Sequence, residues 1–240
     1  MNALVQKHWR RMQRSLGRRY REWRLPRGYE RFGTRYGGWW IDTTLVGRDP
    51  LVVDAGLGAD ISFPSAFLAR FGGQVMGIDP NPQSIRYVEA HKPPGMQVLQ
   101  NAFWRDAGED ITFHMPRALD QLPKGADGVS GSVLSSHSYT AGGTQFTVKT
   151  TSLDHVLSLA GRNACDILKM DIEGAEYDVL AALCRTGAIR KATQVLIEFH
   201  HHCTDHPLAD TLNTVALVQQ AGFQLVYTED RNYIFKRLDA

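Results

Sequence analysis

From residue 51 onward, the chain alternates between two patterns of hydrophobic and polar residues. Short apolar runs bounded by turn residues are typical of buried strands, whereas apolar residues that recur every three or four positions are typical of amphipathic helices. The runs predict strands over 51–55, 74–79, 96–100, 166–171, 193–199, 223–228 and 232–237. The recurring positions predict helices over about 62–71, 82–91, 152–160, 175–185 and 208–221. Strands that alternate with helices indicate an α/β domain built on a mostly parallel sheet.

The last two predicted strands are too close together to be parallel neighbours. Only the residues from Glu229 to Arg231 separate them. A parallel pair needs a crossover connection of about a dozen residues or more, whereas an antiparallel pair can be joined by a short turn. The pattern therefore predicts a mostly parallel sheet with one antiparallel strand.

The first 35 residues have a different pattern and a different charge. They contain 11 basic and 2 acidic residues, whereas the rest of the chain contains 16 basic and 23 acidic residues. Apolar side chains recur at helical spacing, at Val5, Trp9, Met12, Leu16, Tyr20 and Trp23. Pro26 is expected to end this helix. We therefore divide the chain into a basic amphipathic arm, 1–35, and a domain, 36–240.

The basic arm has several interpretations. Its apolar face favours docking on its own domain or on a second subunit, which would make a homo-oligomer. A peripheral contact with an anionic membrane surface is the alternative. We expect no nucleic-acid partner, because no recognised binding motif accompanies the charge.

Cysteine content and hydropathy exclude other classes. The three cysteines are odd in number and lack metal-binding spacing, which argues against a disulfide framework or structural zinc and favours a reducing, cytoplasmic compartment. No run of 18 apolar residues suggests a membrane span. The stretch 122–143 is rich in Gly and Ser and is expected to be a long loop, either a functional lid or a disordered segment.

The first two predicted strands end in residues suited to a nucleoside cofactor. Gly56 and Gly58 follow the first strand, where a ligand can lie against the backbone, and Asp79 ends the second, where a ribose would present its hydroxyls. Asn101, which follows the third predicted strand, is a further candidate cofactor-binding residue at this end of the sheet. Asp60 stands at the entrance of the next helix, where an anion would repel a dinucleotide pyrophosphate. Asp54 and Asp60 instead suit the positive charge of S-adenosylmethionine, so we expect that cofactor in preference to NAD.

A longer motif carries a family resemblance. Residues 165–180 read CDILKMDIEGAEYDVL, which resembles the K-x-D-x-E-G-x-E signature of the FkbM family of S-adenosylmethionine-dependent methyltransferases. The matching residues are Lys169, Asp171, Glu173, Gly174 and Glu176. The resemblance implies a class I methyltransferase (Rossmann-like) fold, with a seven-stranded sheet that is mostly parallel and has one antiparallel strand. It also implies O-methylation of a sugar, a glycan or a glycosylated natural product. The family usually has Gly where Asp60 stands.

Chemistry is expected where the middle strands end. A sugar hydroxyl is a poor acid, so a base must accept its proton or a cation must polarise it. Asp171, His200 and His201 are the candidate catalytic residues, with a histidine as base. In the second version, Asp171, Glu198 and His200 bind a divalent metal such as Mg²⁺. The sequence leaves both versions open.

Neighbouring residues have simpler explanations. Glu173 and Glu176 could cap the following helix, where carboxylates favour the positive end of the dipole. Lys169 lies within an apolar strand and needs a carboxylate partner, for which we expect Glu198. His137, in the Gly/Ser-rich loop, is a candidate for contact with the acceptor.

Two other functions compete with the methyltransferase hypothesis. One is a non-catalytic nucleoside-binding scaffold that keeps the pocket without using it for chemistry. The other is an NAD-dependent oxidoreductase on the same type of sheet, which Asp60 and the lack of a G-x-G-x-x-G turn disfavour.

Overall fold

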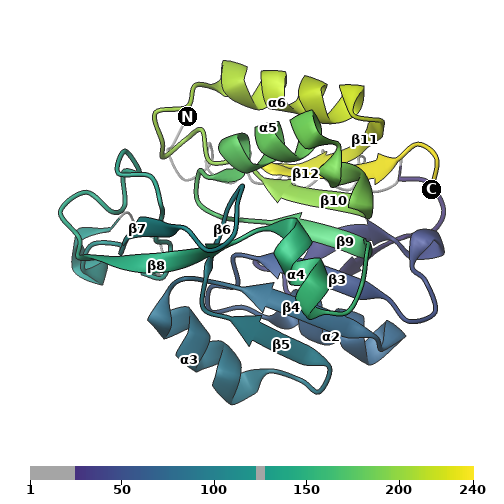
Figure 1. The fold of residues 1–240 in the computed structure, drawn as a ribbon, viewed down its shortest axis with the longest axis horizontal. Helices are drawn as coiled ribbons and strands as arrows, with labels where there is room; N and C mark the ends of the chain where they lie inside the picture. The colour runs from purple at the N-terminus through teal and green to yellow at the C-terminus, as the bar shows by residue number, and fades with distance from the viewer. Residues whose placement is uncertain (1–24, 123–127) are drawn as a thin grey trace, which may run out of the picture.

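The computed structural model describes residues 25–122 and 128–240. Its centre is a seven-stranded sheet with the strand order β11-β12-β10-β9-β3-β4-β5 (Figure 1). The strands are β3 (Leu51–Ala55), β4 (Gln74–Ile78), β5 (Met96–Leu99), β9 (Cys165–Met170), β10 (Ala192–Glu198), β11 (Phe223–Glu229) and β12 (Asn232–Arg237). Each of the seven predicted strands is present, with bounds that differ by one or two residues at most.

The direction of the strands also agrees with the prediction. β12 pairs antiparallel with both β10 and β11, while the pairs from β10 through β9, β3 and β4 to β5 are parallel. The tight β11–β12 connection forces this reversal. The predicted class I methyltransferase architecture is therefore confirmed.

The five predicted helices cover both faces of this sheet. They are α2 (Ser62–Phe71), α3 (Pro82–His91), α4 (Leu153–Leu159), α5 (Glu176–Thr186) and α6 (Leu208–Gln220). Alternating residues of β3 show the two layers, since Val53 packs in a core with α4, α5 and α6, whereas Val52 packs in a core with α2 and α3. Three short 3-10 helices cover η1 (Thr43–Leu45), η2 (Leu119–Gln121) and η3 (Ala188–Lys191).

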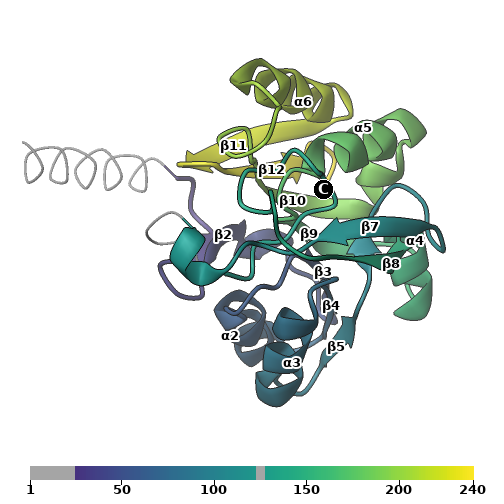
Figure 2. The same cartoon turned by 90° about the vertical axis from the view of Figure 1, so that its left-hand side faces the viewer.

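An antiparallel hairpin precedes the sheet and was not predicted. β1 (Tyr29–Phe32) pairs with β2 (Trp39–Asp42), and Tyr29, Phe32 and Trp39 are buried in the core that contains α2 and α3. Figure 2 shows β2 between α2 and β11. The boundary that the charge pattern placed at residue 35 falls inside this hairpin, so the folded domain includes at least residues 29–35. The helix predicted for the arm lies outside the described residues.

A second small sheet also escaped prediction. It contains β6 (Ala102–Phe103), β7 (Asp110–His114) and β8 (Gln145–Thr151) in the order β6-β8-β7. Figure 1 shows β7 and β8 extending beside the central sheet. The described part of the Gly/Ser-rich stretch lies between β7 and β8 in the chain, and its Ser132 forms an isolated antiparallel bridge with His114 of β7.

Within the described part of the chain, none of the helices has both the length and the apolar character that crossing a bilayer requires.

Candidate active site

A cavity of about 380 Å³ lies at the carboxyl ends of β3, β4, β9 and β10. This is where ligands bind in open α/β sheets, because the strand ends and the following turns leave a crevice there. Of the predicted site residues, those that line the cavity are Gly56, Gly58, Asp60, Asp79, Asp171, Glu198 and His200. Asp54, Asn101 and His201 do not line it.

Asp79 is held rigidly at one end of this cavity. Its Oδ2 accepts hydrogen bonds from the backbone N–H groups of Leu57 and Gly58, each at 3.0 Å, and its Oδ1 accepts one from Asn81 at 2.8 Å. Each carboxylate oxygen has two lone pairs, so Oδ1 can still accept a hydroxyl. Burial raises the pKa of Asp79 to about 6, although these hydrogen bonds oppose the rise.

Gly56 brings the turn after β3 against the end of β9. It has a φ of +85°, and a Cβ atom at this position would stand 1.7 Å from the carbonyl oxygen of Asp171. Only glycine fits both the dihedral and the space. The turn after β3 and the backbone at the end of β9 are therefore in direct contact.

Asp60 connects the β1–β2 hairpin to the wall of the cavity through hydrogen bonds. Its carboxylate accepts hydrogen bonds from Thr34 Oγ1 at 2.5 Å and from the Ser62 backbone at 2.9 Å. Burial would raise its pKa, but the bonds from Ser62, Thr34 and Gly37 outweigh that effect and lower it. Asp60 thus remains an anion at the mouth of the cavity, beside Tyr36.

Lys169 pairs with Asp54 and not with Glu198, which corrects the predicted pairing. The two residues are register partners on the parallel strands β9 and β3, so their side chains lie side by side. Lys169 Nζ stands 2.9 Å from Asp54 Oδ1 and donates to the carbonyl of Gly56. Asp54 is 2% exposed, and its side chain supports the turn from behind without lining the cavity. Its predicted contact with the cofactor is thus replaced by an ion pair.

Two other predicted residues point elsewhere. Asn101 donates from its amide nitrogen to the carbonyl of Lys149 at 3.0 Å, because the chain continues there into β6 beside β8. His201 faces Thr211, with 3.2 Å between Nδ1 and Oγ1. Its neighbour His202 lines the cavity instead, since successive side chains leave the backbone in different directions.

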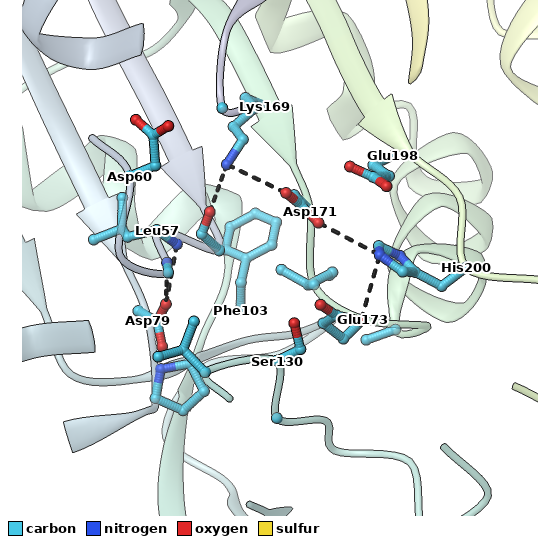
Figure 3. A pocket seen from close by; sticks show the side chains of 18 of the residues that line it. Leu57, Asp60, Asp79, Phe103, Ser130, Lys169, Asp171, Glu173, Glu198 and His200 are labelled. Atoms are coloured by element: carbon cyan, nitrogen blue, oxygen red, sulfur yellow. Dashed lines mark hydrogen bonds and ion pairs between the residues drawn. The ribbon is translucent and has the colours of Figure 1, made fainter. Parts of the chain in front are cut away.

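The other end of the cavity is an acidic edge, by which we mean Asp171, Glu173, Glu198 and His200. Figure 3 shows Asp171 between Lys169 and His200, with Asp171 and Glu173 both facing the same nitrogen of the imidazole. His200 Nε2 stands 3.5 Å from Asp171 Oδ1 and 3.4 Å from Glu173 Oε2. Lys169 Nζ is 4.0 Å from Asp171 Oδ2.

The acidic edge shifts the protonation of its own members. Burial would lower the pKa of His200, but Glu173 and Glu176 outweigh it and hold this pKa well above 6.5. Burial and the charge of Glu198 raise the pKa of Asp171 to about 8. Without a metal, His200 therefore already carries a proton near neutral pH and is not free to accept another, whereas Asp171 titrates close to neutrality.

Glu176 is fully buried and orients His200. Its carboxylate accepts backbone hydrogen bonds from Ile172 at 3.0 Å and Gly174 at 2.9 Å, in the turn before α5. Both N–H groups lie before the helix, so Glu176 holds the preceding turn and does not cap the first turn of α5 as predicted. The same carboxylate lies 2.8 Å from Nδ1 of His200, and Nδ1 therefore donates its proton to Glu176. Nε2 then carries either a lone pair or the second proton of the imidazole.

Glu173 is bound by the Gly/Ser-rich loop. It has a φ of +54°, its carbonyl accepts from Ser132 Oγ at 2.7 Å, and its Oε2 is 3.0 Å from His137 Nε2. The charge of His200 and the hydrogen bond from His137 overcome the effect of burial and lower the pKa of Glu173 to about 2. His137 is fully buried and lies behind the cavity, so its predicted contact with the acceptor is not formed in this conformation.

Sequence reasoning missed several residues of the cavity wall. They are Tyr36, Trp39, Phe103, Tyr139, Arg231 and Asn232. Arg231 donates to Glu198 Oε1 from Nε at 3.0 Å and from Nη2 at 2.7 Å. Its position could have been predicted, because the tight β11–β12 turn lies beside the end of β10. Burial and the charge of Arg231 lower the pKa of His202 to about 4.

Two groups of described residues have the composition of a metal site. In each group the candidate ligand atoms lie within 4.8 Å of one another, and the groups are Asp171, Glu198 and His200, and His137, Glu173 and Cys203. In the second group, His137 Nδ1 accepts from the Tyr139 backbone, so Nε2 carries the proton and donates. Burial raises the pKa of Cys203 to about 12, so its thiol stays protonated.

Three solved structures with a similar fold are each distant from this chain in sequence. The methyltransferase FkbM from Methylobacillus flagellatus KT is 15% identical, with a TM-score of 0.47, over 79% of this chain and 44% of that chain. Fibrillarin from Aeropyrum pernix, in complex with S-adenosyl-L-methionine, is 9% identical, with a TM-score of 0.41, over 88% of this chain and 82% of that chain. A TehB-like S-adenosylmethionine-dependent methyltransferase from Corynebacterium glutamicum ATCC 13032 is 12% identical, with a TM-score of 0.36, over 81% and 83%. This chain thus spans less than half the length of the first of these proteins.

The family assignment depends on the sequence. No protein of curated function matches this chain. The family described as methyltransferase FkbM domain matches residues 53–225, which include the turn after β3, Asp79, the motif around Asp171 and the end of β10. The match covers most of the chain, and the chain therefore belongs to the FkbM family of S-adenosylmethionine-dependent methyltransferases.

Proposed function

We propose that this protein transfers the methyl group of S-adenosylmethionine to a hydroxyl oxygen of a sugar, a glycan or a glycosylated natural product. In this reaction the S–CH₃ bond breaks, a C–O bond forms and the hydroxyl loses its proton. The products are S-adenosylhomocysteine, a methyl ether and a proton. The observation that supports the proposal is that Asp79 and the acidic edge line the same cavity.

Asp79 and the glycine turn suit the cofactor. The remaining lone pair of Asp79 Oδ1 would accept a ribose hydroxyl, and a charge-assisted hydrogen bond of this kind contributes about 1.5–3 kcal/mol. The turn from Gly56 to Gly58 leaves its backbone open to the methionine part. The sulfonium would then lie near Asp171, where negative charge favours it.

The acidic edge suits an oxygen acceptor. A hydroxyl is a poor nucleophile until its proton is removed or acidified, and the edge holds carboxylates at the place where the methyl group would be presented. Either Asp171 takes the proton directly, or a divalent cation such as Mg²⁺, held by Asp171, Glu198 and His200, lowers the pKa of the hydroxyl. Tyr139, Arg231 and Asn232 add polar groups that could bind further hydroxyls of the acceptor.

The first test distinguishes a protein that binds S-adenosylmethionine from an NAD-dependent oxidoreductase. Titration calorimetry of the full chain with S-adenosylmethionine, S-adenosylhomocysteine and NAD should show binding of the first two. Binding of NAD alone would overturn the proposal in favour of an oxidoreductase.

The second test looks for the reaction itself. The full chain is incubated with methyl-labelled S-adenosylmethionine and a panel of sugars, glycolipids and amines, and the label is traced by mass spectrometry. We expect a labelled methyl ether. Transfer only to amines would refute the hydroxyl acceptor, and cofactor binding without transfer to any acceptor would favour the nucleoside-binding scaffold.

A further inference from the structure

We propose that Asp171, Glu198 and His200 bind one divalent metal ion at the acidic edge, and that this ion holds the acceptor hydroxyl during methyl transfer. The inference rests on the proposed function and selects between its two routes for removing the proton. It is argued below from the spacing of the ligand atoms, the orientation of the imidazole and the balance of charge.

The spacing suits a shared ion. Two ligand atoms that are each about 2.1 Å from one ion lie about 3.0–3.4 Å apart when the angle between them is 90–110°. His200 Nε2 and Asp171 Oδ1 are 3.5 Å apart, and the three candidate ligand atoms all lie within 4.8 Å of one another. Small rotations of the partly exposed carboxylate groups of Asp171 and Glu198 would bring the three ligand atoms to these distances.

The imidazole of His200 is already oriented as a metal ligand. Metal-binding histidines usually donate their other N–H to a carboxylate, which fixes the tautomer and aims the free nitrogen at the ion. Here Nδ1 donates to Glu176 at 2.8 Å, and Glu176 is itself fixed by two backbone N–H groups. The side chain of His200 is 4% exposed, so this arrangement is built into the core of the domain.

The neighbouring carboxylates do not form close hydrogen bonds with Nε2. Charge-assisted N–H···O bonds are about 2.7–2.9 Å long. The distances from Nε2 to Asp171 and Glu173 are 3.5 and 3.4 Å. The nitrogen therefore faces both carboxylates across a gap that a proton bridges poorly and an ion would bridge well.

The lysine and the arginine beside the acidic edge are already held by other groups. Lys169 is committed to Asp54 and to the carbonyl of Gly56, and its ammonium is 4.0 Å from Asp171. Both hydrogen bonds of Arg231 go to Oε1 of Glu198, which leaves Oε2 available.

The ligand chemistry favours a transition metal over magnesium. Imidazole suits ions such as Mn²⁺, Fe²⁺ and Zn²⁺, while carboxylates suit Mg²⁺ and Mn²⁺, so Mn²⁺ satisfies both kinds of ligand. A bound divalent ion lowers the pKa of a coordinated hydroxyl and positions its oxygen for attack. Neither effect needs His200 to act as a base.

The experiment measures metal binding without turnover. The full chain is stripped of metal with a chelator, dialysed at pH 8 and titrated with Mn²⁺, and free Mn²⁺ is followed by electron paramagnetic resonance. We expect one ion per chain. Glu198→Gln and His200→Gln should each weaken binding at least tenfold. Glu229→Gln, a matched control at the end of β11 and outside the cavity wall, should leave binding unchanged.

Two further measurements make the result decisive. Circular dichroism and calorimetry with S-adenosylmethionine establish whether each variant is folded and keeps its cofactor site, and Glu198→Gln covers the case in which the buried His200 cannot be replaced. Absence of Mn²⁺ binding in the folded native chain, or equal binding by Glu198→Gln, would overturn the inference. Methyl transfer that persists after chelation would overturn it as well, while leaving the proposed function intact. Failure to bind S-adenosylmethionine would instead refute the proposed function.

Discussion

The carbonyl oxygen of Asp171 occupies the space in which a side chain at Gly56 would stand. A Cβ atom there would be 1.7 Å from that oxygen, and Gly56 has a φ of +85°. The turn that would bind the cofactor and the strand end that would act on the acceptor therefore touch through backbone atoms. Their relative position is set by the fold and cannot relax without moving one of the two strands.

Replacing Gly56 should separate these two parts of the site. Gly56→Ala forces the turn away from β9, and we expect it to lower the free energy of unfolding by about 2–4 kcal/mol and to weaken S-adenosylmethionine binding at least tenfold. Urea unfolding and calorimetry measure the two effects. Gly72→Ala is the matched control, because Gly72 also has a positive φ, +68°, but nothing lies within 4 Å of its Cβ position. Equal effects of the two substitutions would show that the contact with Asp171 is unimportant.

Asp79 should be the main polar anchor of the cofactor. Asp79→Asn places an amide where the carboxylate accepts three backbone N–H bonds, so one nitrogen would face donors. We expect S-adenosylmethionine affinity to fall by about 10- to 100-fold, with a smaller loss of thermal stability. Calorimetry and thermal unfolding of the cofactor-free chain measure the two losses. Unchanged affinity would mean that the ribose lies elsewhere.

The raised pKa of Asp79 predicts an unusual pH dependence. Protonation near pH 6 removes the charged acceptor, so cofactor affinity should fall as the pH decreases through about 6, by up to about tenfold per pH unit. The folded state holds this proton more tightly than the unfolded state, whose pKa is near 3.8. The contribution of Asp79 to the stability of the cofactor-free chain should therefore become more favourable between pH 7 and pH 4, in the opposite direction to cofactor binding.

Titration calorimetry between pH 8 and pH 5 tests this prediction. Asp79→Asn should bind weakly, and its binding should lose the part of the pH dependence that is due to Asp79. Identical pH profiles of the native chain and the variant would assign the dependence to another group.

The ion pair between Lys169 and Asp54 should behave as a buried unit. Lys169→Met leaves the Asp54 carboxylate buried without its partner, and we expect a loss of about 3–5 kcal/mol in the free energy of unfolding. Adding Asp54→Asn removes the charge that was left alone, so the double variant should be more stable than Lys169→Met. Urea unfolding of the single and double variants gives the coupling energy. Additive losses would show that the two side chains are not coupled.

Much of the fold could be predicted because its signals are local. The inner strands β3, β9 and β10 are mostly apolar and are buried along almost their whole length, and the helices repeat their apolar positions at helical spacing. The two small sheets lack such signals. β1 and β2 have four residues each and border a basic segment, and β6 has only two, so their pairing depends on neighbours distant in the sequence.

For the site, the sequence by itself determined which chemical groups meet at one edge of the sheet. Parallel strands bring their carboxyl ends together, so Gly56, Asp79, Asp171 and Glu198 could be placed near one another. Only the tertiary structure decided which side chains face the cavity. The register of β3 against β9 pairs Asp54 with Lys169, and the turn after β10 aims His200 inward and His201 toward Thr211. These choices depend on packing between segments that are far apart in the chain, and a local pattern of residues carries no information about that packing.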